Sequence, residues 1–113
     1  MSADFDASTH PIAQILAPDE RLQNVIRSTD THVIVTDRRI AVSDADRIAL
    51  DMAIEELRRI QFDIERDRPA TLVIVPESPS HQPQVVAIPP ADFEQVGEAL
   101  AYIGHRLYPT VED

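Results

Sequence analysis

Residues 47–64 decide the fold of this chain, and their sequence is RIALDMAIEELRRIQFDI. Helix-forming residues dominate 47–58, so intrinsic propensity favours a helix there. Such a helix would place Leu50, Ile54 and Leu57 on one face. A strand instead has an apolar residue at every second position. This alternation is seen at Ile48, Leu50, Met52 and Ile54. Local signals favour a helix over 47–58 and leave a strand open.

Strand-like runs lie on both sides of this stretch. They are short, rich in β-branched residues and bounded by turn-forming residues, and they span residues 21–28, 32–36, 40–42, 71–75 and 84–88. Asp37-Arg38 joins two of these runs closely enough for a hairpin. The alternation of Ile60, Phe62 and Ile64 predicts a further strand. Residues 8–16 predict one or two helical turns, and loops are expected at 43–46, 66–69 and 76–83.

The C-terminal segment has the clearest helical pattern. Apolar residues recur at spacings of three and four from Phe93 to Leu107, which predicts one amphipathic helix. Asp92 lies near its beginning, where the helix dipole favours an acid, and Pro109 ends it. Short strands followed by one such helix predict a small sheet or barrel plugged by a helix.

Composition limits the class of protein. The chain of 113 residues suits one domain with one core. Its 20 acidic residues face ten arginines and no lysine, which gives a net charge of −10. That charge repels phosphate, so it disfavours nucleic acid as a partner and disfavours binding to an anionic membrane. Cysteine is absent, and we find neither a signal peptide nor a membrane-spanning run, so we expect a cytoplasmic protein.

Catalytic and cofactor motifs are missing from the sequence. Its two glycines both lie in the predicted helix and cannot form a phosphate-binding loop. No serine lies in a nucleophile motif. No two histidines have the spacing of metal ligands; the histidines are His10, His32, His81 and His105. We therefore predict a protein that is not an enzyme and that has no cofactor and no metal.

Two arginine pairs are candidate interaction residues. Arg38-Arg39 lies at the predicted hairpin, and Arg58-Arg59 begins a predicted strand. Either pair would clamp an anion or form ion pairs with the surplus of acidic residues. Since adjacent residues on a strand point to opposite faces, each pair would place one guanidinium on each side.

A line of small residues is the other candidate. Gly97, Ala101 and Gly104 lie beside the apolar stripe of the predicted helix. Glycine in a helix costs about 1 kcal/mol relative to alanine, so two of them need a reason. They would serve either tight seating of the helix on the sheet or close approach of a partner.

Three segments resemble landmarks of the bacterial PH-like (pleckstrin-homology-like) domain family. Thr36-Asp37-Arg38-Arg39-Ile40 follows a β-branched run and resembles the T-x-x-R hairpin of that family. Residues 52–60 resemble the next landmark, in which a strand, a short turn with acids and a second strand follow one another. Leu16 with Asp19-Glu20 is similar to the segment that enters the first strand.

The resemblance implies a mostly β fold with a C-terminal α-helix, a PH-like open barrel or sandwich of about seven antiparallel strands capped by one helix. It replaces the helix at 47–58 by two strands with a short turn near residues 55–57. The alternative is an α+β fold that keeps the helix at 47–58. We place the domain at 10–109, between a flexible N-terminal tail of residues 1–9 and a C-terminal tail of residues 110–113.

The resemblance also bears on function. Bacterial PH-like domains look like adaptor pieces, and some assemble into rings. The implied function is a non-catalytic binding module whose partner is another protein or a second copy of itself. The alternative is binding of an anionic lipid or a small anionic ligand through the arginine residues.

Overall fold

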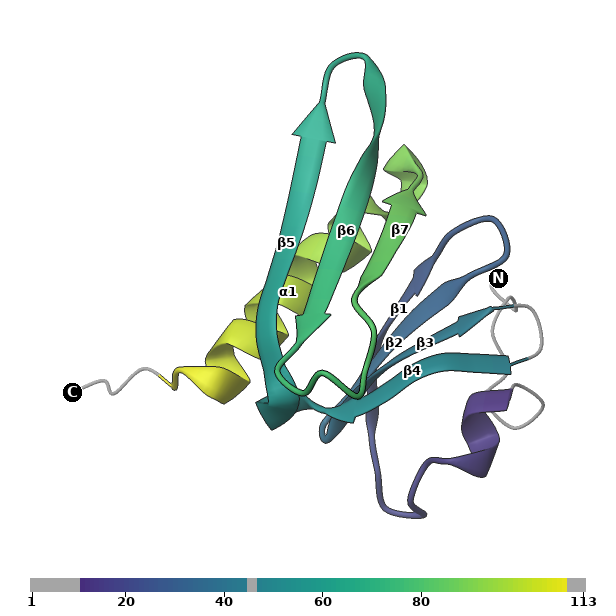
Figure 1. The fold of residues 1–113 in the computed structure, drawn as a ribbon, viewed down its shortest axis with the longest axis vertical. Coiled ribbons are helices and arrows are strands. Elements are labelled where there is room, and N and C mark those ends of the chain that lie inside the picture. The colour runs from purple at the N-terminus through teal and green to yellow at the C-terminus, as the bar shows by residue number, and fades with distance from the viewer. Residues whose placement is uncertain (1–10, 45–46, 110–113) are drawn as a thin grey trace.

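Seven strands and one α-helix follow one another in the part of the chain that the computed structural model describes, residues 11–44 and 47–109 (Figure 1). Their bounds are β1 (Leu22–Arg27), β2 (His32–Thr36), β3 (Arg39–Asp44), β4 (Arg47–Ala53), β5 (Leu57–Glu65), β6 (Arg68–Pro76), β7 (Gln84–Ile88) and α1 (Phe93–Leu107). Short 3₁₀ turns are η1 (Pro11–Gln14), η2 (Ile54–Glu56) and η3 (Pro90–Asp92). The tails expected at 1–9 and 110–113 lie outside the described residues.

The strands form two antiparallel sheets. One has the order β1-β2-β3-β4 and the other the order β5-β6-β7. The helix α1 lies behind β5 and β6 in Figure 1 and extends past β5 at its C-terminal end. The fold is therefore mostly β with one C-terminal helix, and the expected seven antiparallel strands are confirmed.

Residues 47–64 form two strands rather than a helix. β4 pairs with β3 along its length, and the short turn η2 leads directly into β5. The alternating residues Leu50, Met52 and Ile54 are all buried. Their burial outweighs a helix propensity that amounts to a few tenths of a kcal/mol per residue. The two-strand prediction is confirmed, and the helix at 47–58 is wrong.

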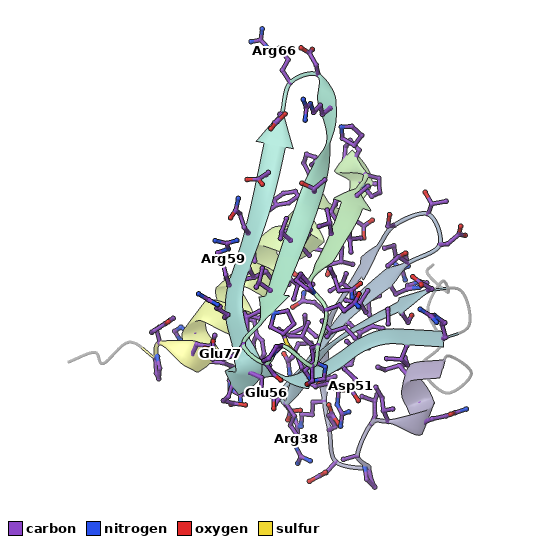
Figure 2. All side chains as sticks on the ribbon, in the orientation of Figure 1. Arg38, Asp51, Glu56, Arg59, Arg66 and Glu77 are labelled. Atoms are coloured by element: carbon purple, nitrogen blue, oxygen red, sulfur yellow. The ribbon has the colours of Figure 1, made fainter. Side chains whose placement is uncertain are left out.

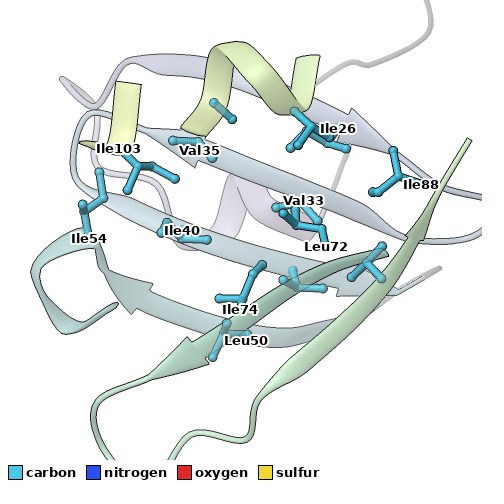
Figure 3. Close-up of a cluster of buried hydrophobic side chains, with 14 of the residues drawn as sticks. Ile26, Val33, Val35, Ile40, Leu50, Ile54, Leu72, Ile74, Ile88 and Ile103 are labelled. Atoms are coloured by element: carbon cyan, nitrogen blue, oxygen red, sulfur yellow. The ribbon is translucent and has the colours of Figure 1, made fainter. Parts of the chain in front are cut away.

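The larger of two hydrophobic clusters among the described residues lies between the two sheets and the helix, and the smaller one, around Ile12, Ile34 and Ala41, lies under η1. Figure 3 shows Val35 and Ile40 of the first sheet facing Leu72 and Ile74 of the second, with Ile103 of α1 beside them. All five side chains are almost completely buried. Burial of such a side chain stabilises the fold by about 1.5–3 kcal/mol. The helix is thus an integral part of the core.

Two predicted loops are shorter than expected. Ser43 and Asp44 belong to β3, and Arg68 and Pro69 belong to β6. In each case the hairpin ladder continues to the turn, where Asp44 pairs with Arg47 and Glu65 with Arg68. None of the described residues has a positive φ angle, so the turn between β5 and β6 forms without a left-handed backbone. No helix among the described residues is long and apolar enough to cross a membrane.

Hydrogen bonds fix the first turn of α1 against β1. The backbone N–H of Arg27 donates to Asp92 Oδ2 at 2.7 Å, and Asn24 Nδ2 donates to Gln95 Oε1 at 3.2 Å. Asp92 stands at the N-cap position but makes no side-chain bond to the helix N–H groups. Its carboxylate therefore ties the helix to the neighbouring strand.

The C-terminal end of α1 is held from the other side. The Arg106 guanidinium donates to the carbonyl oxygen of Asp37 and, at 2.9 Å, to Glu55 Oε2. Asp37 lies in the turn between β2 and β3, and Glu55 lies in η2. Among the described residues, no hydrogen bond of this kind attaches the flank of the helix that lies next to β5.

Candidate functional site

Arg38 and Arg39 are engaged in ion pairs. Arg39 makes two bonds to Glu20, Nε to Oε2 at 2.8 Å and Nη2 to Oε1 at 3.0 Å. Its Nη1 donates to Asp51 Oδ1 at 3.0 Å. Arg38 pairs with Asp19 at 2.8 Å on the exposed surface. An anion at this hairpin would compete with three carboxylates, so Arg38 and Arg39 are poorly placed to clamp one.

The Glu20 carboxylate is the centre of this cluster, and its side chain is completely buried. Thr36 Oγ1 donates to Glu20 Oε2 at 2.5 Å, and the N–H of Ala17 donates to Oε1 at 2.9 Å. Burial alone would raise the pKa of Glu20, but the hydrogen bonds from Arg39, Thr36 and Ala17 outweigh it and lower that pKa. The cluster therefore holds Glu20 ionised.

Arg58 and Arg59 lie elsewhere, at the start of β5. Both are exposed, and neither forms an ion pair with the described part of the chain. Figure 2 shows Arg59 directed away from the sheet, far from Arg38. The register of β5 against β6 shifts between Leu57 and Arg59, which leaves Arg58 without a partner residue in β6.

A groove lies between the start of β5 and the C-terminal half of α1. We call it the β5–α1 groove; its volume is about 370 Å³, and it is lined by Leu57, Arg58, Arg59, Ile60, Leu100, Ile103, Gly104, Leu107 and Tyr108. The walls are mainly apolar, and the two unpaired arginines stand on one of them. The structure thus brings Arg58, Arg59 and Gly104 together at one place.

Of the small residues of α1, Gly104 lines this groove; by the helical period, Gly97 and Ala101 lie on the same side of the helix at earlier turns and do not line it. Gly97 and Gly104 are exposed, and so is Ala101. A Cβ atom added at either glycine would meet no atom within 4 Å. Tight seating of the helix on the sheet is therefore the wrong explanation for these glycines. They leave open space on the groove side of the helix.

β5 also presents an unpaired sheet edge to the groove. It is the first strand of the order β5-β6-β7 and pairs with β6 alone among the described strands. No backbone hydrogen bond outside the sheets is made to its outer edge by the described residues. An unpaired edge of this kind can accept an added strand.

Two other pockets contain arginines that are already engaged in ion pairs. One of them, of about 580 Å³, lies near the far end of β5, and its Arg68 is paired with Glu65 at 3.4 Å. A second, of about 450 Å³, contains Arg38 and Arg39 together with Asp51 and Glu56. The described residues contain no group of three potential metal-ligating His, Asp or Glu side chains.

No model of a known family and no curated protein matches this chain. Among solved structures, a pleckstrin homology domain from Shewanella amazonensis SB2B is similar. The TM-score is 0.60, and the match covers 85% of this chain and 91% of that chain. The chain has a PH-like fold. The expected resemblance is thereby confirmed for the fold, and at 16% sequence identity it shows the PH-like fold alone.

Sequence reasoning found part of the groove of this PH-like fold. Gly104, Arg58 and Arg59 were singled out by residue type, although they lie on separate elements. Leu100 and Leu107 belong to the apolar stripe predicted for the helix; they pack against the core and also line the groove. The helical period alone could have shown that they flank the glycine line, but not that β5 lies opposite.

Proposed function

We propose that this domain is a non-catalytic binding module that holds an extended protein segment in the β5–α1 groove. The observation that carries the proposal is the unpaired edge of β5 beside a helix flank without side chains at Gly97 and Gly104. Main-chain hydrogen bonds to an edge strand supply affinity, and side-chain pockets beside it supply specificity. The open flank of α1 leaves room for the side chains of that segment.

The groove favours a protein segment over a small anion. Of the four arginines singled out by the sequence, Arg38 and Arg39 are neutralised by Asp19, Glu20 and Asp51. The remaining pair borders a mainly apolar groove. An anionic lipid or small anion would use the charge of Arg58 and Arg59 but not the open sheet edge.

A selection from a library of displayed random peptides tests this function, with the domain immobilised at low density. We expect enrichment of peptides that alternate apolar and polar residues. Replacement Gly104→Leu fills the groove and should abolish their binding, whereas the adjacent exposed replacement His105→Leu, outside the groove, should preserve it. Absence of enrichment, or equal binding by Gly104→Leu, would show the proposal to be wrong.

A further inference from the structure

β5 contains one regular stretch between two irregularities. Its register against β6 shifts between Leu57 and Arg59 and again between Asp63 and Glu65. Between these shifts, residues 59–63 pair one by one with residues 75–71 of β6. This five-residue stretch is therefore the part of the open edge that is flat enough to pair with another strand.

The regular stretch is complementary to itself. In an antiparallel pair of two copies centred on Gln61, position 59 faces position 63 and position 60 faces position 62. Arg59 then lies opposite Asp63 of the second copy, twice by symmetry, and Ile60 lies opposite Phe62. Residues directly opposite each other share a face, so the charged pairs stay outside and the apolar pairs stay inside. Opposite charges at such positions stabilise a strand pair.

Neighbouring registers are less favourable. A pair centred on Phe62 would place Arg58 opposite Arg66 of the second copy. A pair centred on Ile60 would place Leu57 opposite Asp63. The first register also places Arg59 opposite Glu65, so charge alone does not select the register. The register centred on Gln61 is the one that pairs all five residues of the regular stretch with one another.

The helix supplies an independent observation. A strand added at the β5 edge would lie beside the groove side of α1, where Gly104 is exposed, and Gly97 and Ala101 are exposed on the same side of the helix at earlier turns. No atom lies within 4 Å of a Cβ added at either glycine, so the second copy meets open space there. Small residues are also what lets two backbones approach closely.

We propose that the domain forms a symmetric dimer in which β5 pairs with β5 of a second copy, antiparallel and centred on Gln61. The two three-stranded sheets then join into one continuous sheet of six strands. The pairing rests on the proposed function, because it names the extended segment that occupies the groove. Twofold symmetry is the commonest arrangement of protein oligomers.

Charge reversal tests the pairing by molecular mass in solution, measured by light scattering at about 0.15 M salt, where distant charges are screened. The wild type should have twice the chain mass of 12.6 kDa. Arg59→Asp and Asp63→Arg each place like charges opposite each other twice, and each should weaken association about 100-fold. Arg66→Asp carries the same charge change outside the paired stretch and should leave the dimer intact.

Recombination of the reversed charges gives the decisive result. The two single variants mixed in equal amounts should form a heterodimer. In that heterodimer the aspartate introduced at position 59 of one copy faces the arginine introduced at position 63 of the other, and the unchanged Asp63 of the first faces the unchanged Arg59 of the second. The double variant Arg59→Asp/Asp63→Arg should dimerise again on its own. Circular dichroism of every variant should match the wild type, because Arg59 is exposed and Asp63 is only partly buried.

A monomeric wild type at millimolar concentration, or a mixture that stays monomeric, would overturn the pairing. If displayed peptides still bind and Gly104→Leu still abolishes their binding, the groove function stands and only self-pairing is wrong. If the true occupant of the groove is an acidic peptide, Arg59→Asp should weaken its binding and Asp63→Arg should not. That result would also contradict the dimer.

Discussion

At the scale of single residues, Glu20 joins the segment before β1 to the first hairpin. Its buried carboxylate accepts bonds from Arg39, from Thr36 and from the Ala17 N–H. Thr36 in turn accepts the N–H groups of Arg38 and Arg39 at 3.0 Å each. One ionised side chain therefore stabilises both the entry segment and the turn between β2 and β3.

Replacement Glu20→Gln should destabilise the domain by about 2–3 kcal/mol at neutral pH, because it leaves Arg39 partly buried with one of its two carboxylate partners removed. The pKa of Glu20 is lowered in the folded state. Its stabilisation is therefore full above the ordinary glutamate pKa of about 4.3 and is lost as pH falls through the lower folded value.

Urea unfolding of the wild type and of Glu20→Gln at a series of pH values measures this effect. The difference between their free energies of unfolding should be constant from about pH 7 to pH 5 and should shrink below about pH 4. Asp19→Asn removes a carboxylate from an exposed ion pair and is the control, with an expected change below about 0.5 kcal/mol. A difference that does not vary with pH would contradict the assigned role of Glu20.

Sequence reasoning named Arg38 and Arg39 but not their partners. Arg39 and Glu20 are 19 positions apart, and Arg39 and Asp51 are 12 apart. No local period connects such positions, because the strand order brings them together. The partner of Asp92 was not predictable either. Its place near the start of the helix was predicted, but its bond to the Arg27 N–H depends on where β1 lies.

At the scale of elements, α1 combines a buried face with an open flank. Val96, Ala99 and Ile103 are buried in the core, and Gly97 and Gly104 face open space. Glycine lowers the stability of a helix interior, and here no packing requires it. The glycines therefore lower the stability of the isolated domain, although packing within the domain does not require them.

Gly97→Ala and Gly104→Ala should each raise the stability of the monomer by about 0.5–1 kcal/mol, which corresponds to a rise of about 4 °C in melting temperature. The physical reason is the smaller backbone entropy lost by alanine and the absence of any atom within 4 Å of the new Cβ. Thermal unfolding of dilute protein measures it.

Association of the same alanine variants should weaken, because the added methyl groups fill the flank that the second copy approaches. Ala101→Gly is the reciprocal control and should lower the melting temperature. A fall in melting temperature for both alanine variants would mean that the flank is packed rather than open.

The elements themselves were largely predictable. The helix followed from its apolar period, and most strands followed from β-branched runs between turns. Local sequence was not enough to assign residues 47–58, because their propensity favours a helix and their alternation favours a strand. Pairing of β4 with β3 decides between them, and such pairing is absent from any local window. That β5 lies at a sheet edge likewise depends on the strand order.

At the scale of the whole molecule, the net charge of −10 sets which surfaces the domain can approach. An anionic leaflet attracts basic clusters by about 1 kcal/mol per base near the surface. Among the described arginines, Arg58 and Arg59 form the adjacent pair without ion pairs, against a large acidic excess. Two bases cannot offset that excess.

Co-sedimentation with vesicles containing phosphatidylserine should therefore leave the domain in the supernatant, even at low salt, where the attraction of basic groups would be strongest. Vesicles of neutral phosphatidylcholine are the control. Sedimentation with the anionic vesicles alone, lost in the variant Arg58→Ala/Arg59→Ala, would instead support the lipid-binding alternative.

The absence of positive φ angles from the described turns has a consequence for the unfolded chain. Turns of this kind accept any L-amino acid, so they do not need glycine, and the sequence contains two glycines against nine prolines. Proline restricts an unfolded chain and glycine loosens it. A denatured ensemble of this composition is therefore stiff and has less conformational freedom to lose on folding.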